Sequence, residues 1–221
     1  MGTERIAGRE QPDLDYCVEW RPYLWRRPVR QALAFLGDVS GKHILEIGGR
    51  SGKMSCLFAM QGARVTMLER GSVDAAQAEA KRWGVDDRVR AVATDGTMAA
   101  IAGQRFDIVF TKSVLWSIER LEPVLKAFDD HLAPGGRIAF VENSRGGRLL
   151  QWFRWHVAHR KTRYQHVYHG IRPDQLDLFR RHFDTVKVRS YLGLVYVITG
   201  RKAAQADLAQ TGASQAARSS H

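Results

Sequence analysis

Short apolar runs alternate with amphipathic stretches along most of the chain. The apolar run 44–47 ends at two glycines, and a segment with helical spacing, 53–60, separates it from a second apolar run at 64–68. A short apolar run bounded by glycine predicts a strand, and apolar residues at three- and four-residue intervals predict a helix. The alternation continues to residue 141, so we expect five strand–helix units and a parallel, doubly wound sheet.

The last two predicted strands break this alternation. Residues 183–191 and 194–201 both have strand-like patterns, and only a short turn around Gly193 separates them. A connection this short leaves no room for a crossover helix, so the two strands pair antiparallel. We therefore expect an α/β fold: a doubly wound, seven-stranded, mostly parallel sheet with the last strand antiparallel and helices on both faces.

The segment before the first strand is rich in aromatic residues and arginines. Pro22 and Pro28 predict that residues 14–36 are interrupted and form two short helices, the second ending at Gly37. These helices either pack on the edge of the sheet or form a lid over a ligand. We expect a flexible N-terminus at 1–13, one domain over 14–202 with lid helices at 14–37 and a substrate-side insert at 143–173, and a disordered tail at 203–221.

Glycines and acids surround the turn that follows the first strand. Gly48 and Gly52 allow the backbone to approach a ligand closely, and the following helix presents unpaired N–H groups at its start. Glu69, at the end of the second strand, can accept hydrogen bonds from both hydroxyls of a ribose. Glu46 would repel a diphosphate at this turn but would tolerate a ligand with ammonium and sulfonium groups. An ordinary strand–helix turn without a ligand is the alternative.

The stretch 46–52 resembles the first motif of the class I S-adenosylmethionine-dependent methyltransferases, whose usual form is acid-x-Gly-x-Gly-x-Gly. Residues 106–109 (Phe-Asp-Ile-Val) and the turn at 132–136 before the fifth strand resemble later motifs of this family, in the same order. The chain departs from the family at Arg50, where glycine is usual, and at 116–117, where Trp-Ser stands in place of two histidines. The resemblance is to the small-molecule branch (methyltransferase type 11/12-like).

This resemblance implies an enzyme that transfers a methyl group from S-adenosylmethionine and leaves S-adenosylhomocysteine. In the family the glycine turn lies under the methionine part of the cofactor, and acids after the second and third strands lie near the ribose and the adenine. The predicted cofactor-binding residues are Glu46, Gly48, Gly49, Arg50, Gly52, Glu69, Arg70, Asp95, Gly96, Thr111, Lys112 and Ser113. Arg50 either crowds this site or points outward, and Asp95-Gly96 is alternatively a simple turn.

Composition adds a strong positive charge. The chain has 34 Lys and Arg against 23 Asp and Glu, a formal net charge of +11, which indicates nucleic acid, anionic lipid or an acidic small molecule as a partner. Cys17 and Cys56 fit no metal or redox spacing, and we predict no metal site. No apolar run is long enough to span a membrane, and residues 1–15 lack a signal-peptide core. We expect a cytoplasmic protein, and the sequence leaves its oligomeric state open.

The insert 143–173 follows the fifth strand at the sheet edge where ligands bind in this fold class. It contains no acid, and its arginines alternate with aromatic residues and histidines. It is an amphipathic helix with solvated arginines, a pocket for an anionic, aromatic or glycosidic small molecule, or an RNA-binding surface. The predicted substrate-binding residues are Tyr16, Trp20, Trp116, Asn143, Arg145, Arg148, Trp152 and Tyr164.

Histidines of this insert are the candidates for a general base. A histidine near its ordinary pKa can take a proton from a hydroxyl as the methyl group transfers, and the sequence does not say which one does. The candidates are His156, His159, His166 and His169. Zinc is disfavoured because no acid or cysteine nearby completes a site. We expect methylation of an O or N atom of a small molecule; the alternatives are an RNA methyltransferase using residues 145–172, a nucleotide-dependent oxidoreductase and a non-catalytic relative closed by Arg50.

Overall fold

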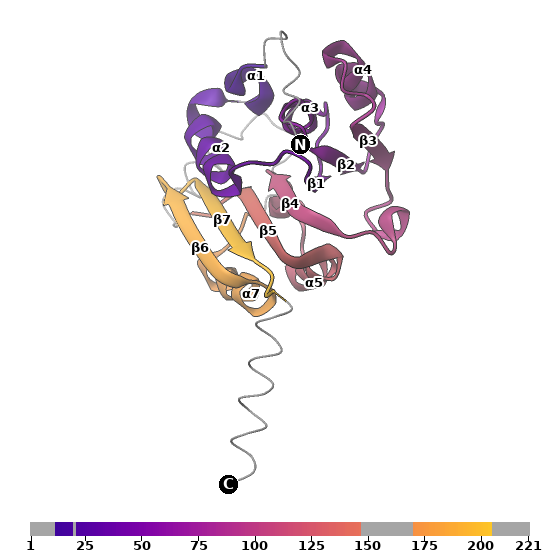
Figure 1. Cartoon of the computed structure of the whole chain (residues 1–221). Helices are drawn as coiled ribbons and strands as arrows, with labels where there is room; N and C mark the ends of the chain where they lie inside the picture. Colours follow the sequence, from indigo (N-terminus) through magenta and orange to yellow (C-terminus); the bar gives the residue numbers. More distant parts are fainter. Residues whose placement is uncertain (1–11, 20, 147–169, 205–221) are drawn as a thin grey trace.

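The computed structural model describes residues 12–19, 21–146 and 170–204, and its centre is a seven-stranded sheet (Figure 1). The strands are β1 (His43–Ile47), β2 (Arg64–Glu69), β3 (Val89–Ala93), β4 (Phe106–Lys112), β5 (Leu132–Asn143), β6 (Asp184–Tyr191) and β7 (Val195–Arg201). Their order is β3-β2-β1-β4-β5-β7-β6, and β7 is antiparallel to both of its neighbours. The predicted fold class is therefore confirmed.

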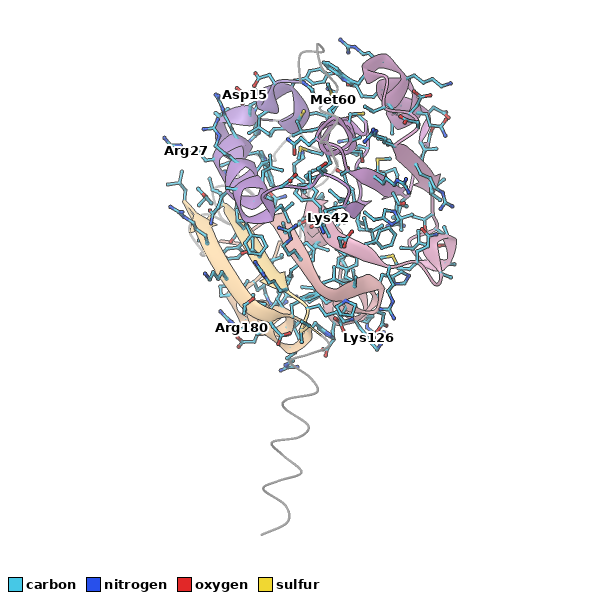
Figure 2. The ribbon with its side chains drawn as sticks, in the orientation of Figure 1. Asp15, Arg27, Lys42, Met60, Lys126 and Arg180 are labelled. Carbon is cyan, nitrogen blue, oxygen red and sulfur yellow. The ribbon has the colours of Figure 1, made fainter. Side chains whose placement is uncertain are left out.

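Helices cover both faces of the sheet, and side chains fill the space between the layers (Figure 2). One apolar cluster joins the sheet to α1 (Leu14–Val18), α2 (Pro22–Leu36), α3 (Lys53–Met60) and α4 (Asp74–Trp83). The other joins it to α5 (Leu121–His131), α7 (Leu176–His182) and the 3-10 turns η1 (Ala99–Ile101) and η2 (Leu115–Ser117), and η4 (Pro173–Gln175) precedes α7. None of the helices within the described residues has the length and apolar character needed to cross a membrane.

Helix α2 runs through Pro28 without a break, so the predicted interruption at this residue is wrong. Proline removes one backbone hydrogen bond from a helix interior and costs about 3 kcal/mol in an isolated helix. Here Trp25, Pro28, Val29 and Leu36 are all buried against the sheet, and this burial offsets the lost bond. Pro22, by contrast, begins α2 as predicted.

The predicted turn at 132–136 lies inside β5 and not in front of it. Phe106 of β4 pairs with Leu132, whereas Ile108 pairs with Arg137, so the longer stretch of β5 bulges out of the ladder. Gly135 has φ +72° within this bulge, a conformation that favours glycine. The Pro-Gly-Gly sequence therefore produces a bulge in a long strand, which a turn pattern alone does not distinguish from a helix–strand connection.

Three segments of the chain fall outside the described residues. These are the N-terminus up to residue 11, residues 147–169 of the insert and the tail from residue 205. Nothing in the structure tests the flexibility expected of the termini. The sequence pattern did not single out η4 and α7, which link the insert to β6.

Phe140 gives a test of the packing on the α5–α7 face. It is fully buried in β5, and its ring centroid lies 5.7 Å from that of Phe128 and 6.0 Å from that of Phe179. Phe140→Ala should lower the free energy of unfolding by about 3–5 kcal/mol, because it leaves a cavity among aromatic rings. Leu192→Ala, at a side chain that is 87% exposed, should change it by less than about 0.5 kcal/mol. Chemical denaturation measures both; similar losses in the two variants would contradict this packing.

Candidate functional site

The predicted cofactor residues meet at the edge of the sheet where the parallel strands end. Ile47, the last residue of β1, pairs with Leu68 of β2 on one side and with Thr111 of β4 on the other. The glycine turn 48–52 therefore begins between Glu69 and Lys112, the last residues of those two strands. This edge is the usual ligand site of open parallel sheets.

The glycine turn is closely packed and accommodates an arginine. Gly52 has φ +74°, and a Cβ at this position would lie 2.8 Å from the Cβ of Ala76 on α4, so a side chain is excluded. Arg50 also lies in the left-handed region, with φ +46°, and the residue is exposed. Arg50 is therefore not buried in the turn, and whether its side chain crowds a ligand there stays a prediction.

Glu69 attaches the glycine turn to β2. One of its carboxylate oxygens accepts a hydrogen bond from the Arg50 N–H (2.8 Å), and the other accepts one from the Arg70 N–H (2.9 Å). A carboxylate has about four lone-pair positions, so acceptors remain for a pair of hydroxyl groups. Glu69 thus has a structural role in the turn and is also suited to bind a ribose.

Glu46 is a buried carboxyl group directly before the turn. It is 2% exposed, and the hydroxyl of Ser55 on α3 donates a hydrogen bond to it. Burial raises the pKa of Glu46 to about 7, although the Ser55 hydrogen bond and the charge of Lys112 lower it. A cationic ligand group beside Glu46 would favour the ionised form, so this position is suited to an ammonium or a sulfonium.

The N-terminal segment lies across the glycine turn. Glu19 accepts a hydrogen bond from the Ser51 hydroxyl (2.7 Å) and pairs with the Lys53 ammonium (3.2 Å). On the other side of the turn, Lys112 donates a hydrogen bond to the backbone carbonyl of Val18 (3.1 Å). The segment predicted as a lid is therefore attached both to the turn and to the end of β4.

Tyr16 on α1 contacts α3 and α4. Its hydroxyl donates a hydrogen bond to Glu79 (2.6 Å) and accepts one from Arg82 (3.0 Å), and the Lys53 ammonium lies 4.1 Å from its ring centroid. The hydrogen bond to Glu79 is the main cause of the raised pKa of Tyr16. These contacts explain Tyr16 by the packing of α1, and its predicted contact with the acceptor stays a prediction.

A second buried carboxyl group, Glu142, organises the loop after β4. It is fully buried and accepts hydrogen bonds from the Thr111 hydroxyl (2.7 Å) and from the N–H groups of Val114 and Leu115 (2.9 Å each). Burial raises the pKa of Glu142 to about 7, and these hydrogen bonds lower it. The sequence pattern pointed to Thr111 but not to Glu142; an acid at the end of an apolar strand, as at Glu46, was the available signal.

Ser113, Trp116 and Asn143 come together where β4 and β5 end. The Asn143 side-chain amide donates a hydrogen bond to the Ser113 hydroxyl (2.7 Å), and the Trp116 indole N–H donates to the Ser113 carbonyl (2.7 Å). Ser113 has φ +59°, which is uncommon for a residue with a side chain. Arg145 lies just beyond this group and is exposed. The structure thus groups residues that the sequence assigned separately to the cofactor and to the acceptor.

Asp95 forms a turn after β3. One of its oxygens accepts a hydrogen bond from the Thr97 N–H (2.9 Å), and its hydrogen bonds with Thr97 lower the pKa of Asp95. A Cβ on Gly96, whose φ is +102°, would lie 3.7 Å from Nε of Arg70, so the ends of β2 and β3 are adjacent here. Asp95 and Gly96 therefore form a turn, and a contact of Asp95 with adenine stays a prediction.

Several predicted site residues lie outside the described parts of the chain, and their roles stay predictions. They are Trp20, Arg148, Trp152 and Tyr164 among the substrate contacts, and the candidate bases His156, His159, His166 and His169. The structure therefore describes the predicted acceptor contacts only on α1, on η2 and around the end of β5.

Comparison with known proteins gives a consistent result. Residues 18–183, from the end of α1 to the residue after α7, match a family model described as a methyltransferase domain. The chain is also similar to a ubiquinone biosynthesis O-methyltransferase of Chromobacterium violaceum, with 27% identity over 173 residues. The match covers 74% of this chain and 73% of that protein.

Solved structures share the fold. An O-methyltransferase family protein from Burkholderia thailandensis has a TM-score of 0.68 and 15% identity, and the likeness covers 87% of this chain and 60% of that one. An S-adenosylmethionine-dependent methyltransferase from Mesorhizobium loti has a TM-score of 0.63 and 18% identity, over 86% of this chain and 100% of that one. The chain thus spans less than two thirds of the first structure and the full length of the second. At these identities the likeness shows the fold alone.

The two buried carboxyl groups predict that stability falls as pH rises. The pKa of Glu46 and that of Glu142 are about 7 in the folded chain and near the ordinary value of 4.5 in the unfolded chain. The folded state therefore binds more protons between these values, and the free energy of unfolding should decrease from pH 5 to pH 8. Glu46→Gln should make the decrease shallower, because the amide does not titrate. Thermal unfolding at several pH values measures this, with the exposed Glu122→Gln as control; an unchanged slope in Glu46→Gln would contradict the raised pKa.

Proposed function

The chain belongs to the class I S-adenosylmethionine-dependent methyltransferases, and we propose that it methylates an oxygen atom of a small, anionic or aromatic/glycosidic acceptor. The observation that carries the cofactor part of this proposal is the pair of acids at the glycine turn: Glu46 is buried near the end of β1, and Glu69 lies at the end of β2. The relative from Chromobacterium violaceum, an O-methyltransferase by name, supports oxygen over nitrogen as the methylated atom.

S-adenosylmethionine fits the side chains around the turn. The cofactor carries an ammonium, a sulfonium, a carboxylate and a ribose diol, and it supplies a methyl group bonded to a positively charged sulfur. Glu69 would bind the ribose hydroxyls, and Glu46 would face the positive charges; the backbone of Gly48 and Gly49 would form the floor of the site. Asp95 and its neighbours Arg70 and Gly96 would lie near the adenine.

The acceptor would bind at the ends of β4 and β5. Ser113 and Asn143 offer polar contacts there, and Trp116 offers an aromatic ring. Methyl transfer is an in-line displacement, so the protein contributes mainly by orienting the acceptor oxygen toward the methyl group and by excluding water. One histidine of the insert would take the acceptor proton. RNA methylation by the basic segment 145–172 is the second candidate, supported by the composition of that segment.

Calorimetric titration with S-adenosylhomocysteine tests the cofactor site. Glu69→Ala should weaken binding by about 1–3 kcal/mol, because it removes the acceptor of the ribose hydroxyls. Glu122→Ala, an exposed acid on α5, should leave the affinity unchanged. Glu69 also accepts a hydrogen bond from the Arg50 N–H, so its removal can destabilise the turn. The unfolding temperature of each variant is therefore measured alongside. An unchanged affinity in Glu69→Ala would overturn the ribose role, and a folded wild type that binds no S-adenosylhomocysteine would overturn the cofactor assignment.

Transfer of a labelled methyl group tests the acceptor class. Label should enter small phenols and hydroxy acids and not RNA or primary amines. Asn143→Ala should lower kcat/KM for such an acceptor about tenfold, the value of one lost hydrogen bond, and leave the Kd of S-adenosylhomocysteine unchanged. Label found only in RNA would favour the second candidate, and loss of cofactor binding in Asn143→Ala would move this residue to the cofactor site.

A further inference from the structure

Lys112 places a positive charge beside the glycine turn. It is the last residue of β4, directly after the pair between Thr111 and Ile47, so it lies next to Gly48. Its ammonium donates a hydrogen bond to the Val18 carbonyl (3.1 Å) and lies 5.8 Å from the centroid of the Trp25 ring. Lys112 therefore lies on the face of the sheet covered by α1 to α3, between the lid segment and the turn.

The ammonium of Lys112 has hydrogen-bond donors to spare. It has three N–H donors, and among the described residues its hydrogen bond goes to one backbone carbonyl, with no carboxylate within 4.0 Å. Burial lowers the pKa of Lys112, and the negative charges of Glu19, Glu46 and Glu142 raise it. A partly buried cation with acids nearby, but bonded to none of those that the structure describes, is suited to bind an anionic ligand group.

Glu46 and Lys112 form a pair of opposite charges on one face of the sheet. Glu46 pairs with Phe110 in the β1–β4 ladder, and Lys112 lies two residues beyond Phe110, so the two side chains point to the same face. An α-amino acid carries an ammonium and a carboxylate on one carbon, and such a pair is complementary to both. S-adenosylmethionine ends in this group, and its carboxylate is its only anion.

We propose that Lys112 binds the carboxylate of the methionine part of S-adenosylmethionine, while Glu46, with Glu19, binds the ammonium. Glu69 lies on the opposite side of the turn, so the ribose and the amino-acid end are recognised by different strands. Because Lys112 also holds the Val18 carbonyl, the carboxylate is bound where the N-terminal segment meets the turn. This inference rests on the cofactor assignment and not on the choice of acceptor.

The test compares S-adenosylmethionine with decarboxylated S-adenosylmethionine, which keeps the ammonium and the sulfonium but lacks the carboxylate. Calorimetry without acceptor gives a Kd for each ligand. The wild type should prefer S-adenosylmethionine by about tenfold or more, the value of a hydrogen bond to a charged group. Lys112→Met should remove most of this preference, and Lys112→Arg should retain most of it.

A matched control separates a direct contact between Lys112 and the carboxylate from a general effect of removing a positive charge. Lys53→Met removes another lysine from the same region, one that already pairs with Glu19 at 3.2 Å, and it should leave the preference between the two ligands within about threefold. Circular dichroism and the unfolding temperature report whether each variant is folded. If Lys112→Met does not fold, Lys112→Gln takes its place, since it keeps a polar end without the charge.

Two results would overturn the proposal alone. In the first, Lys112→Met weakens both ligands to the same degree, which assigns the residue a structural role or a long-range charge effect. In the second, it leaves both affinities unchanged and lowers only kcat/KM, which moves Lys112 to the acceptor side. A folded wild type that binds neither ligand would overturn the cofactor assignment together with the proposal.

Discussion

The close contact between the glycine turn and α4 is the constraint on which the rest of the site depends. Gly52 has no room for a side chain because Ala76 lies against it, and this contact sets how α3 leaves the sheet. With the turn fixed in this way, the ends of β2 and β4 lie on either side of it. The groups proposed to bind the cofactor are thus positioned by the packing of the turn against α4, and their own polar contacts add to a position already determined.

Charge is concentrated at this edge at a cost to stability. Glu46 and Glu142 are buried carboxyl groups, and Lys112 is partly buried near both of them. Buried charged groups are expensive unless they are paired, and apolar residues of similar size would fill the same space more cheaply. Buried charged groups are typical of functional sites, where the same charges that lower the stability of the fold can bind a ligand. Glu142 also has a structural use, since its carboxylate accepts hydrogen bonds from backbone N–H groups of the loop after β4.

The sequence was sufficient to predict the architecture, because the period of the apolar residues and the length of the connections can be read locally along the chain. The strand–helix alternation and the short connection at Gly193 predicted the sheet, including its antiparallel strand. The misses have a common cause, since Pro28 and the Pro-Gly-Gly stretch follow local rules that tertiary packing overrides. The place of a candidate residue next to a turn or at a strand end could be predicted, whereas the partners of Tyr16 and Glu142 come from distant parts of the chain and only the fold reveals them.

The attachment of the N-terminal segment has a consequence for the speed of turnover. Glu19 is bonded to Ser51 and Lys53, and Val18 is bonded to Lys112, so the segment is attached to the protein on both sides of the glycine turn. If the cofactor binds between this segment and the turn, as proposed, its exchange would require these contacts to break and reform in every cycle. These are a few individual polar contacts, and contacts of this kind can open on the timescale of lid motions. The release of S-adenosylhomocysteine and the opening of this segment would then share one kinetic barrier.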